Sequence, residues 1–164
     1  MTTDNQSITV DVRPVLEILN RFAQVPAVQA VVREAQALAL ARLNDDANLR
    51  VAFVPINLAS LKVALPEQAR SLRVVATRGA GGDTVERHAN CAQYLFVLDA
   101  LLETHVETSS GWRIDRYGQG DEHTLENRWH YLPQGVWHKS LAPGASSWSV
   151  LAIHSAAEVT DEFR

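Results

Sequence analysis

Apolar side chains in the first 48 residues recur at helical spacing. Two series repeat every three or four positions, and Pro26 separates them. The first series is Val12, Val15, Leu16, Leu19 and Phe22, and the second is Val28, Val31, Val32, Ala35, Leu38, Ala39 and Leu43. Each series places an apolar stripe on one face of a helix. The pattern predicts two amphipathic helices, the second ending at the polar cluster of residues 44–46.

Beyond residue 48 the pattern changes to short β-branched and aromatic runs separated by turns. Gly and Pro punctuate these runs at intervals of about 8–12 residues, which is typical of an antiparallel sandwich or barrel. The predicted strands are 49–55, 72–78, 84–88, 94–106 with a break near Asp99, 112–117, 127–132, 136–141 and 148–154. We therefore expect a mainly β domain at residues 49–164. Residues 1–48 form its N-terminal helical extension, which we expect to cover an edge or end of the barrel.

Composition narrows the function classes. The 164 residues hold 15 Lys plus Arg against 19 Asp plus Glu, a net charge of −4. Nucleic acids and anionic membranes both need clustered positive charge, so neither is an expected partner. The single cysteine, Cys91, excludes an intrachain disulfide. The N-terminus lacks the pattern of a signal peptide and no apolar run is long enough to span a membrane, so we expect a cytoplasmic protein.

Residues able to carry chemistry are concentrated in the β region. All six His, all four Trp and all three Tyr lie at or beyond residue 88. Two histidines, His88 and His138, each lie beside a turn, and on a strand His88 and Asn90 project to the same face. Strand pairing that brings His138 beside them would gather imidazole and amide groups in one cavity. Neutral imidazole is a preferred ligand of Zn, Fe, Ni and Cu.

The residues around His88 resemble the first motif of the cupin superfamily. That motif runs Gly, five residues, His-x-His, three or four residues, Glu, six residues, Gly. Gly82 and His88 match its opening, Asn90 takes the place of the second His, Gln93 lies near the Glu position, and Ala100 replaces the closing Gly.

The residues around His138 match the second cupin motif more fully. Pro133, Gly135 and His138 reproduce its Pro-x-Gly-x-x-His core. The resemblance covers about residues 70–155. It implies a jelly-roll barrel, also called a double-stranded β-helix, and a homodimer. It also implies a divalent transition metal (Fe, Zn, Ni or Mn) held by His88, Gln93 and His138.

A small organic ligand is expected beside this site. Asn90, Tyr94, Phe96 and His154 are the candidate pocket residues, although aromatic residues on strands more often pack in the core. Two functions remain open at this point. The protein is a metal-dependent oxygenase, isomerase or lyase, or it is a metal-free binding or sensor domain in which His88, Gln93 and His138 form a hydrogen-bonded polar lining.

The other histidines are assigned simpler roles. His105 and His130 lie on strands, where a structural or solvent-facing role is expected. His123 lies in a polar loop beside Asp121 and Glu122, where solvent exposure is expected.

Overall fold

The two predicted helices are present at the N-terminal end of the described chain. The computed structural model describes residues 11–118 and 124–164, so the expectations for residues 1–10 and for His123 lie outside it. Helix α1 spans Arg13–Ala23 and α2 spans Pro26–Asp45. Pro26 opens α2, because a first-turn position needs no backbone N–H donor. In the described part of the chain, no helix has the length and apolarity needed to cross a bilayer.

Two antiparallel sheets, each of five strands within the described residues, make up the rest of the fold. The helix-side sheet has the order β1 (Val51–Ile56), β2 (Ser71–Arg78), β9 (Ser147–His154), β4 (Gln93–Val97) and β7 (Trp129–Leu132). The outer sheet has the order β10 (Asp161–Phe163), β3 (Glu86–His88), β8 (His138–Leu141), β5 (Leu102–Thr108) and β6 (Gly111–Tyr117). Short helical segments η1 (Leu58–Leu61) and α3 (Leu125–Arg128) lie in the connections. The predicted mainly β fold is confirmed.

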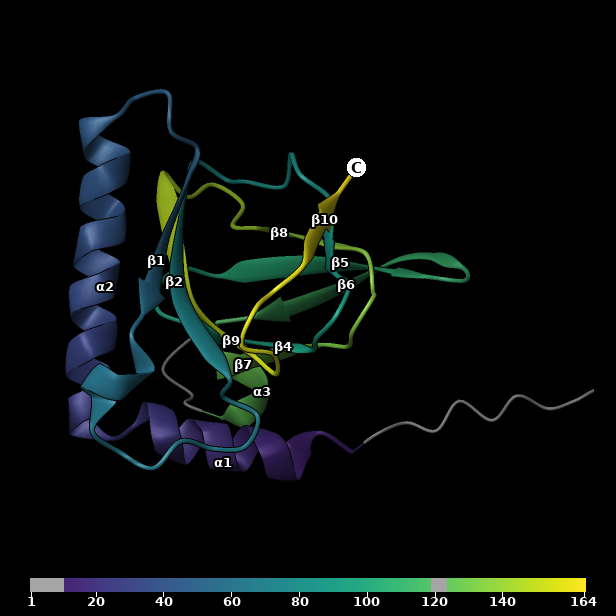
Figure 1. Ribbon diagram of the computed structural model, residues 1–164. Coiled ribbons are helices and arrows are strands. Elements are labelled where there is room, and N and C mark those ends of the chain that lie inside the picture. The colour runs from purple at the N-terminus through teal and green to yellow at the C-terminus, as the bar shows by residue number, and fades with distance from the viewer. Residues whose placement is uncertain (1–10, 119–123) are drawn as a thin grey trace, which may run out of the picture.

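Helix α2 covers a face of the helix-side sheet, which corrects the prediction for this helix, whereas α1 runs across one end of the fold (Figure 1). Helix α2 runs along β1 and β2 and contacts both (Figure 1). The physical reason is that β2 carries an apolar face on the side away from the other sheet. Leu72, Val74 and Ala76 of β2 pack in the core shared with the helices, whereas Val75 between them faces the other sheet.

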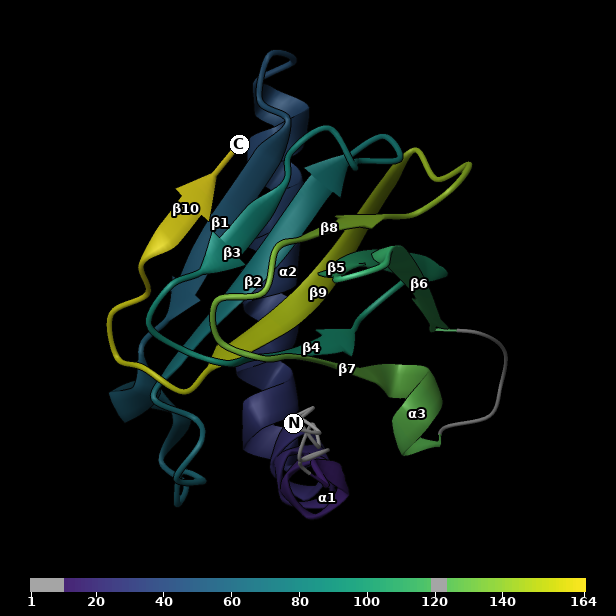
Figure 2. The same cartoon turned by 90° about the vertical axis from the view of Figure 1, so that its right-hand side faces the viewer.

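The interior between the sheets holds a second core and several polar side chains. Its apolar part includes Leu95, Leu102 and Leu132, all buried. The outer sheet crosses in front of the helix-side sheet, with β3 and β8 facing β2 and β9 (Figure 2). This arrangement encloses the residues that bear on function.

The structure adds one strand that the sequence pattern did not predict. Strand β10 has three residues and pairs with β3, so that Asp161 lies opposite His88. Three residues are too few to show an alternating pattern, and the strand follows a run of small and polar residues. Its position beside β3 matters for the site described next.

Candidate metal centre

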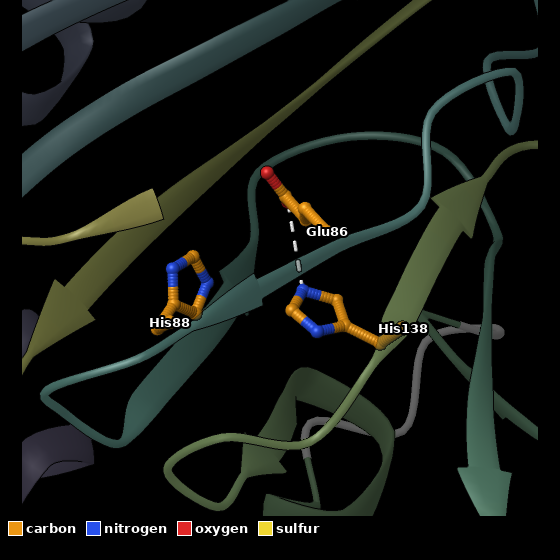
Figure 3. Close-up of side chains that lie close together, drawn as sticks. All are labelled: Glu86, His88 and His138. Carbon is orange, nitrogen blue, oxygen red and sulfur yellow. Dashed lines mark ion pairs between the residues drawn. The ribbon is translucent and has the colours of Figure 1, made fainter. Parts of the chain in front are cut away.

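Strands β3 and β8 bring together one carboxylate and two imidazoles. Glu86 and His88 lie two residues apart on β3 and therefore on the same face. Across the β3–β8 pair, Glu86 is the register partner of His138. One ligand atom from each of the three residues lies within 4.8 Å of the others (Figure 3). The two rings are buried, whereas the Glu86 side chain is 30% exposed.

Asp161 orients the ring of His88. Its Oδ1 lies 2.7 Å from His88 Nδ1, and its Oδ2 accepts a hydrogen bond from Arg73 Nη1 at 3.1 Å. The hydrogen bond with His88, aided by the charge of Arg73, holds the pKa of Asp161 well below its usual range. Asp161 is therefore a carboxylate that accepts the Nδ1 proton, which leaves the lone pair of His88 on Nε2. That Nε2 is buried and has no hydrogen-bond partner among the described residues.

His138 is held in the same tautomer by the backbone. Its Nδ1 lies 3.1 Å from the carbonyl oxygen of Val136, to which it donates. Its Nε2 faces Oε1 of Glu86 at 3.5 Å. Burial raises the pKa of Glu86, but contact with His138 and the positive charge available on both rings outweigh it, so that the pKa is lowered overall. A carboxylate oxygen and an imidazole nitrogen therefore face each other, and a proton or a metal ion between them satisfies both.

The donor set suits a divalent transition metal. Two imidazole nitrogens and one carboxylate oxygen are the ligands that bind Zn²⁺, and on one face of an open site they suit Fe(II). Ligand atoms at about 2.1 Å from one ion lie about 3.0–3.4 Å apart. Closing the present group around an ion therefore shortens these separations by at most about 1.8 Å. Side-chain rotation alone supplies movement on this scale.

Gln93 and His154 form a second polar pair next to the first group. Both are buried, and the Gln93 amide nitrogen lies 3.0 Å from His154 Nε2. The rings of His154 and His88 lie 5.3 Å apart, edge to face. Burial, together with the positive charge of Arg73, lowers the pKa of His154 to about 3. His154 is thus neutral near pH 7, and the role of Gln93 as a metal ligand stays a prediction.

The other predicted pocket residues lie elsewhere. Asn90 is exposed and bridges to the C-terminal segment, donating to the carbonyl of Glu158 and accepting from the backbone N–H of Thr160. Tyr94 and Phe96 alternate with the interior residues of β4 and pack in the core shared with the helices. The strand alternation that carries Gln93 inward therefore carries these two rings outward.

Glu86 and Asp161 were not found by sequence reasoning. The geometry favours a first-motif register two residues earlier, in which Glu86 and His88 occupy the two His positions. Four residues then separate His88 from Gln93, which takes the Glu position of the motif. Six more separate Gln93 from Ala100, which takes the position of the closing Gly. Ala100 has a φ of +69°, a left-handed conformation that favours glycine, as the closing Gly of the motif would. The four-residue spacing to Gln93 was the available signal for Glu86. Nothing in the spacing pointed to Asp161.

A cavity of about 330 Å³ adjoins the metal group. Glu86 and Gln93 form part of its wall, so a ligand in the cavity can contact the carboxylate of this group. Apolar side chains from the helix-side sheet form the opposite wall. These include Phe53, Val75, Leu95, Trp148 and Val150.

The comparisons with known proteins bear on the fold. No protein-family model and no curated sequence matches the chain. Among solved structures, Bacillus subtilis oxalate decarboxylase with its Mn(II) centres is similar at a TM-score of 0.54 and 15% identity, over 70% of this chain and 28% of that one. Procruciferin, the 11S globulin of Brassica napus, gives 0.51 and 15% over the same shares. Peruvianin-I, a cysteine peptidase from Thevetia peruviana latex, gives 0.52 and 8%, over 70% and 67%.

These similarities concern architecture. The chain spans little more than a quarter of the decarboxylase and the globulin, and the identities are low. Both proteins are cupin folds. The chain therefore has the cupin fold, built from two antiparallel sheets with helix α2 packed on the outer face of one of them.

Proposed function

We propose that the protein binds one divalent transition metal ion through Glu86, His88 and His138, and a small organic ligand in the adjoining cavity. The observation that carries the proposal is the orientation of the two rings. Both Nδ1 atoms are engaged by oxygen acceptors, and both Nε2 atoms point to one place beside a carboxylate. Such hydrogen bonds behind a histidine ligand fix its tautomer and strengthen it as a donor.

The site supports metal-dependent chemistry on the ligand. Three protein ligands leave coordination positions free, and a metal ion there would polarise an oxygen of a bound substrate. Glu86 faces both the cavity and His138, so it would hold the ion at the cavity wall. An oxygenase, isomerase or lyase acting on a small metabolite is the function that this arrangement supports best. Fe, Zn, Ni and Mn all remain candidates for the ion.

Metal content tests the proposal directly. The native protein, purified without chelators, is expected to carry close to one equivalent of Fe, Zn, Ni or Mn by elemental analysis. The His138→Ala variant is expected to lose it, because the remaining His88 and Glu86 form only half of a four-coordinate shell. His105→Ala is the matched control, since His105 contacts Glu103 and lies outside the group. Absence of metal from the native protein, and no uptake on addition, would contradict the proposal.

A metal-free binding or sensor domain is the second candidate. The neutral pair Gln93 and His154 favours it, because both side chains are buried and can donate or accept without an ion. In that case the native protein binds ligand after treatment with chelator as tightly as before. Metal analysis and ligand binding therefore separate the two candidates.

The protein is also proposed to form a homodimer. The edge of the outer sheet supports this, because Trp112 and Ile114 of β6 are each 44% exposed there. An exposed edge strand offers unpaired backbone groups to a second copy.

A further inference from the structure

An arginine from the helix-side sheet lies between the two sheets, next to the metal group formed by Glu86, His88 and His138. Arg73 is on the interior face of β2 and lines the same cavity as Glu86 and Gln93. Its side chain is only 19% exposed. One edge of the guanidinium is engaged, since Nη1 donates to Asp161, and the group lies 5.0 Å from the centre of the Phe53 ring. Arg73 is therefore fixed in place on one side.

The other side of this guanidinium lacks a partner. The Nε of Arg73 is buried and makes no hydrogen bond within the described residues. Buried donors are normally paired, because an unpaired one loses its bonds to water without replacement. The five N–H groups of arginine form a planar fork that matches the two oxygens of a carboxylate. Asp161 takes one position of the fork and Nε has no partner, so the guanidinium keeps donating capacity for a second carboxylate.

The charge of the cavity wall also favours an anion. Three arginines line it, Arg50, Arg73 and Arg78, against two acids, Asp83 and Glu86. Glu86 belongs to the metal group and is neutralised when an ion binds. The Arg78 guanidinium donates to main-chain carbonyl oxygens and so keeps its full charge. Asp161, which pairs with Arg73, balances one of the arginines, so the guanidinium groups favour an anionic ligand through their positions in the wall rather than through a net excess of charge.

The remaining wall selects the rest of the ligand. Phe53, Val75, Leu95 and Trp148 are apolar, and the cavity of about 330 Å³ lies at the small end of the range for ligand pockets. A phosphate group would need more donors than one unpaired N–H supplies. A single carboxylate on a compact apolar body matches both parts of the wall.

We propose that the cavity binds a small monocarboxylic acid with an apolar body, its carboxylate on the guanidinium of Arg73 and its body against Phe53, Val75 and Trp148. This inference rests on the proposed function, because it names the ligand class of the same site. The contact with Arg73 does not require the metal ion, so the two proposals can fail separately.

Calorimetric titration tests the preference for the acid. The probes are phenylacetate and 4-methylpentanoate, each compared with its neutral amide, on chelator-treated protein and on protein loaded with Zn²⁺. At least one acid is expected to bind the native protein tenfold or more tightly than its amide. In Arg73→Gln this ratio is expected to fall close to one. In Arg116→Gln, whose side chain pairs with Glu103 outside the cavity, it is expected to remain.

Arg73→Gln also removes the hydrogen bond to Asp161, so a second variant tests the cavity while leaving that contact intact. Val75→Phe places a ring in the cavity without changing any charge, and it is expected to weaken acid and amide alike by tenfold or more. Circular dichroism and thermal unfolding show which variants are folded. Equal affinity of the native protein for acids and amides, an unchanged ratio in Arg73→Gln, or unchanged binding in Val75→Phe would overturn the inference.

The metal-free and metal-loaded titrations separate the two proposals. Acid binding that depends on Arg73 in a protein that takes up no metal would support this inference and contradict the proposed metal site. Stoichiometric metal without any preference for acids would support the metal site and contradict this inference.

Discussion

Replacing Asp161 by Asn removes one negative charge behind His88 while keeping the size of the side chain. Asp161 is the acceptor that holds His88 Nδ1 at 2.7 Å, and it is itself held by Arg73 at 3.1 Å. An asparagine oxygen can still accept the proton, but it no longer strengthens the imidazole as a donor. Removing a carboxylate of this kind typically weakens metal binding by about 10–100-fold, which corresponds to about 1.4–2.8 kcal/mol.

Competition with a metal-binding indicator measures this loss. Native protein and Asp161→Asn are titrated with Zn²⁺ at one pH, and the affinities are compared. Glu162→Gln is the matched control, because Glu162 is the next residue of β10, carries the same charge and pairs with Arg87 instead of the metal group. The reasoning is refuted if Asp161→Asn binds Zn²⁺ as tightly as the native protein, or if Glu162→Gln weakens binding to the same extent.

Three further predictions concern stability and assembly. The hydrogen bond from His130, aided by Arg113, holds the pKa of Asp115 well below its usual range. The ionised Asp115 carboxylate therefore stabilises the folded protein above about pH 4, and this stabilisation is lost as the pH falls further. Urea unfolding of Asp115→Asn should therefore show a loss of about 1–2 kcal/mol at pH 7 that shrinks towards pH 3; a difference independent of pH would contradict this. Ala100→Gly should raise the unfolding free energy by about 0.5–1 kcal/mol, because it relieves a left-handed alanine at φ +69°, and a lower melting temperature would count against that reading. Sedimentation should show a dimer that Ile114→Asp, on the free edge of β6, converts to a monomer while Ile18→Asp on α1 does not; equal behaviour of the two variants would exclude this edge as the interface.

The general fold was predictable because its elements follow simple periodicities. Apolar stripes predicted α1 and α2 within two or three residues at each end, and alternating runs separated by Gly and Pro turns predicted most of the strands. The packing of α2 on a face of the sheet was missed. This packing depends on an apolar face of β2 and β9 that points away from the other sheet, and the sequence pattern alone did not separate this outward face from the inward one.

The candidate site was only partly predictable, for reasons specific to its residues. His88 and His138 were identified because each lies in a motif with a recognisable spacing. Glu86 was missed because a carboxylate occupies a position where the motif has a histidine, and Asn90 was placed in the site instead. Asp161 lies 73 positions beyond His88, on a strand of three residues, and only the tertiary pairing of β10 with β3 reveals it.

The pairing of β10 with β3 also sets an order of events during folding. Glu86, His88 and His138 can approach one another once β3 and β8 have paired. Until Asp161 arrives, however, the His88 ring can present either nitrogen, because nothing yet fixes its proton on Nδ1. Long-range pairings of this kind form late, since the closure of a long loop precedes any gain from the contact. If the proposed ion binds, a nascent or partly unfolded chain would therefore compete poorly for scarce metal, and full affinity would appear only when the last strand has joined the sheet.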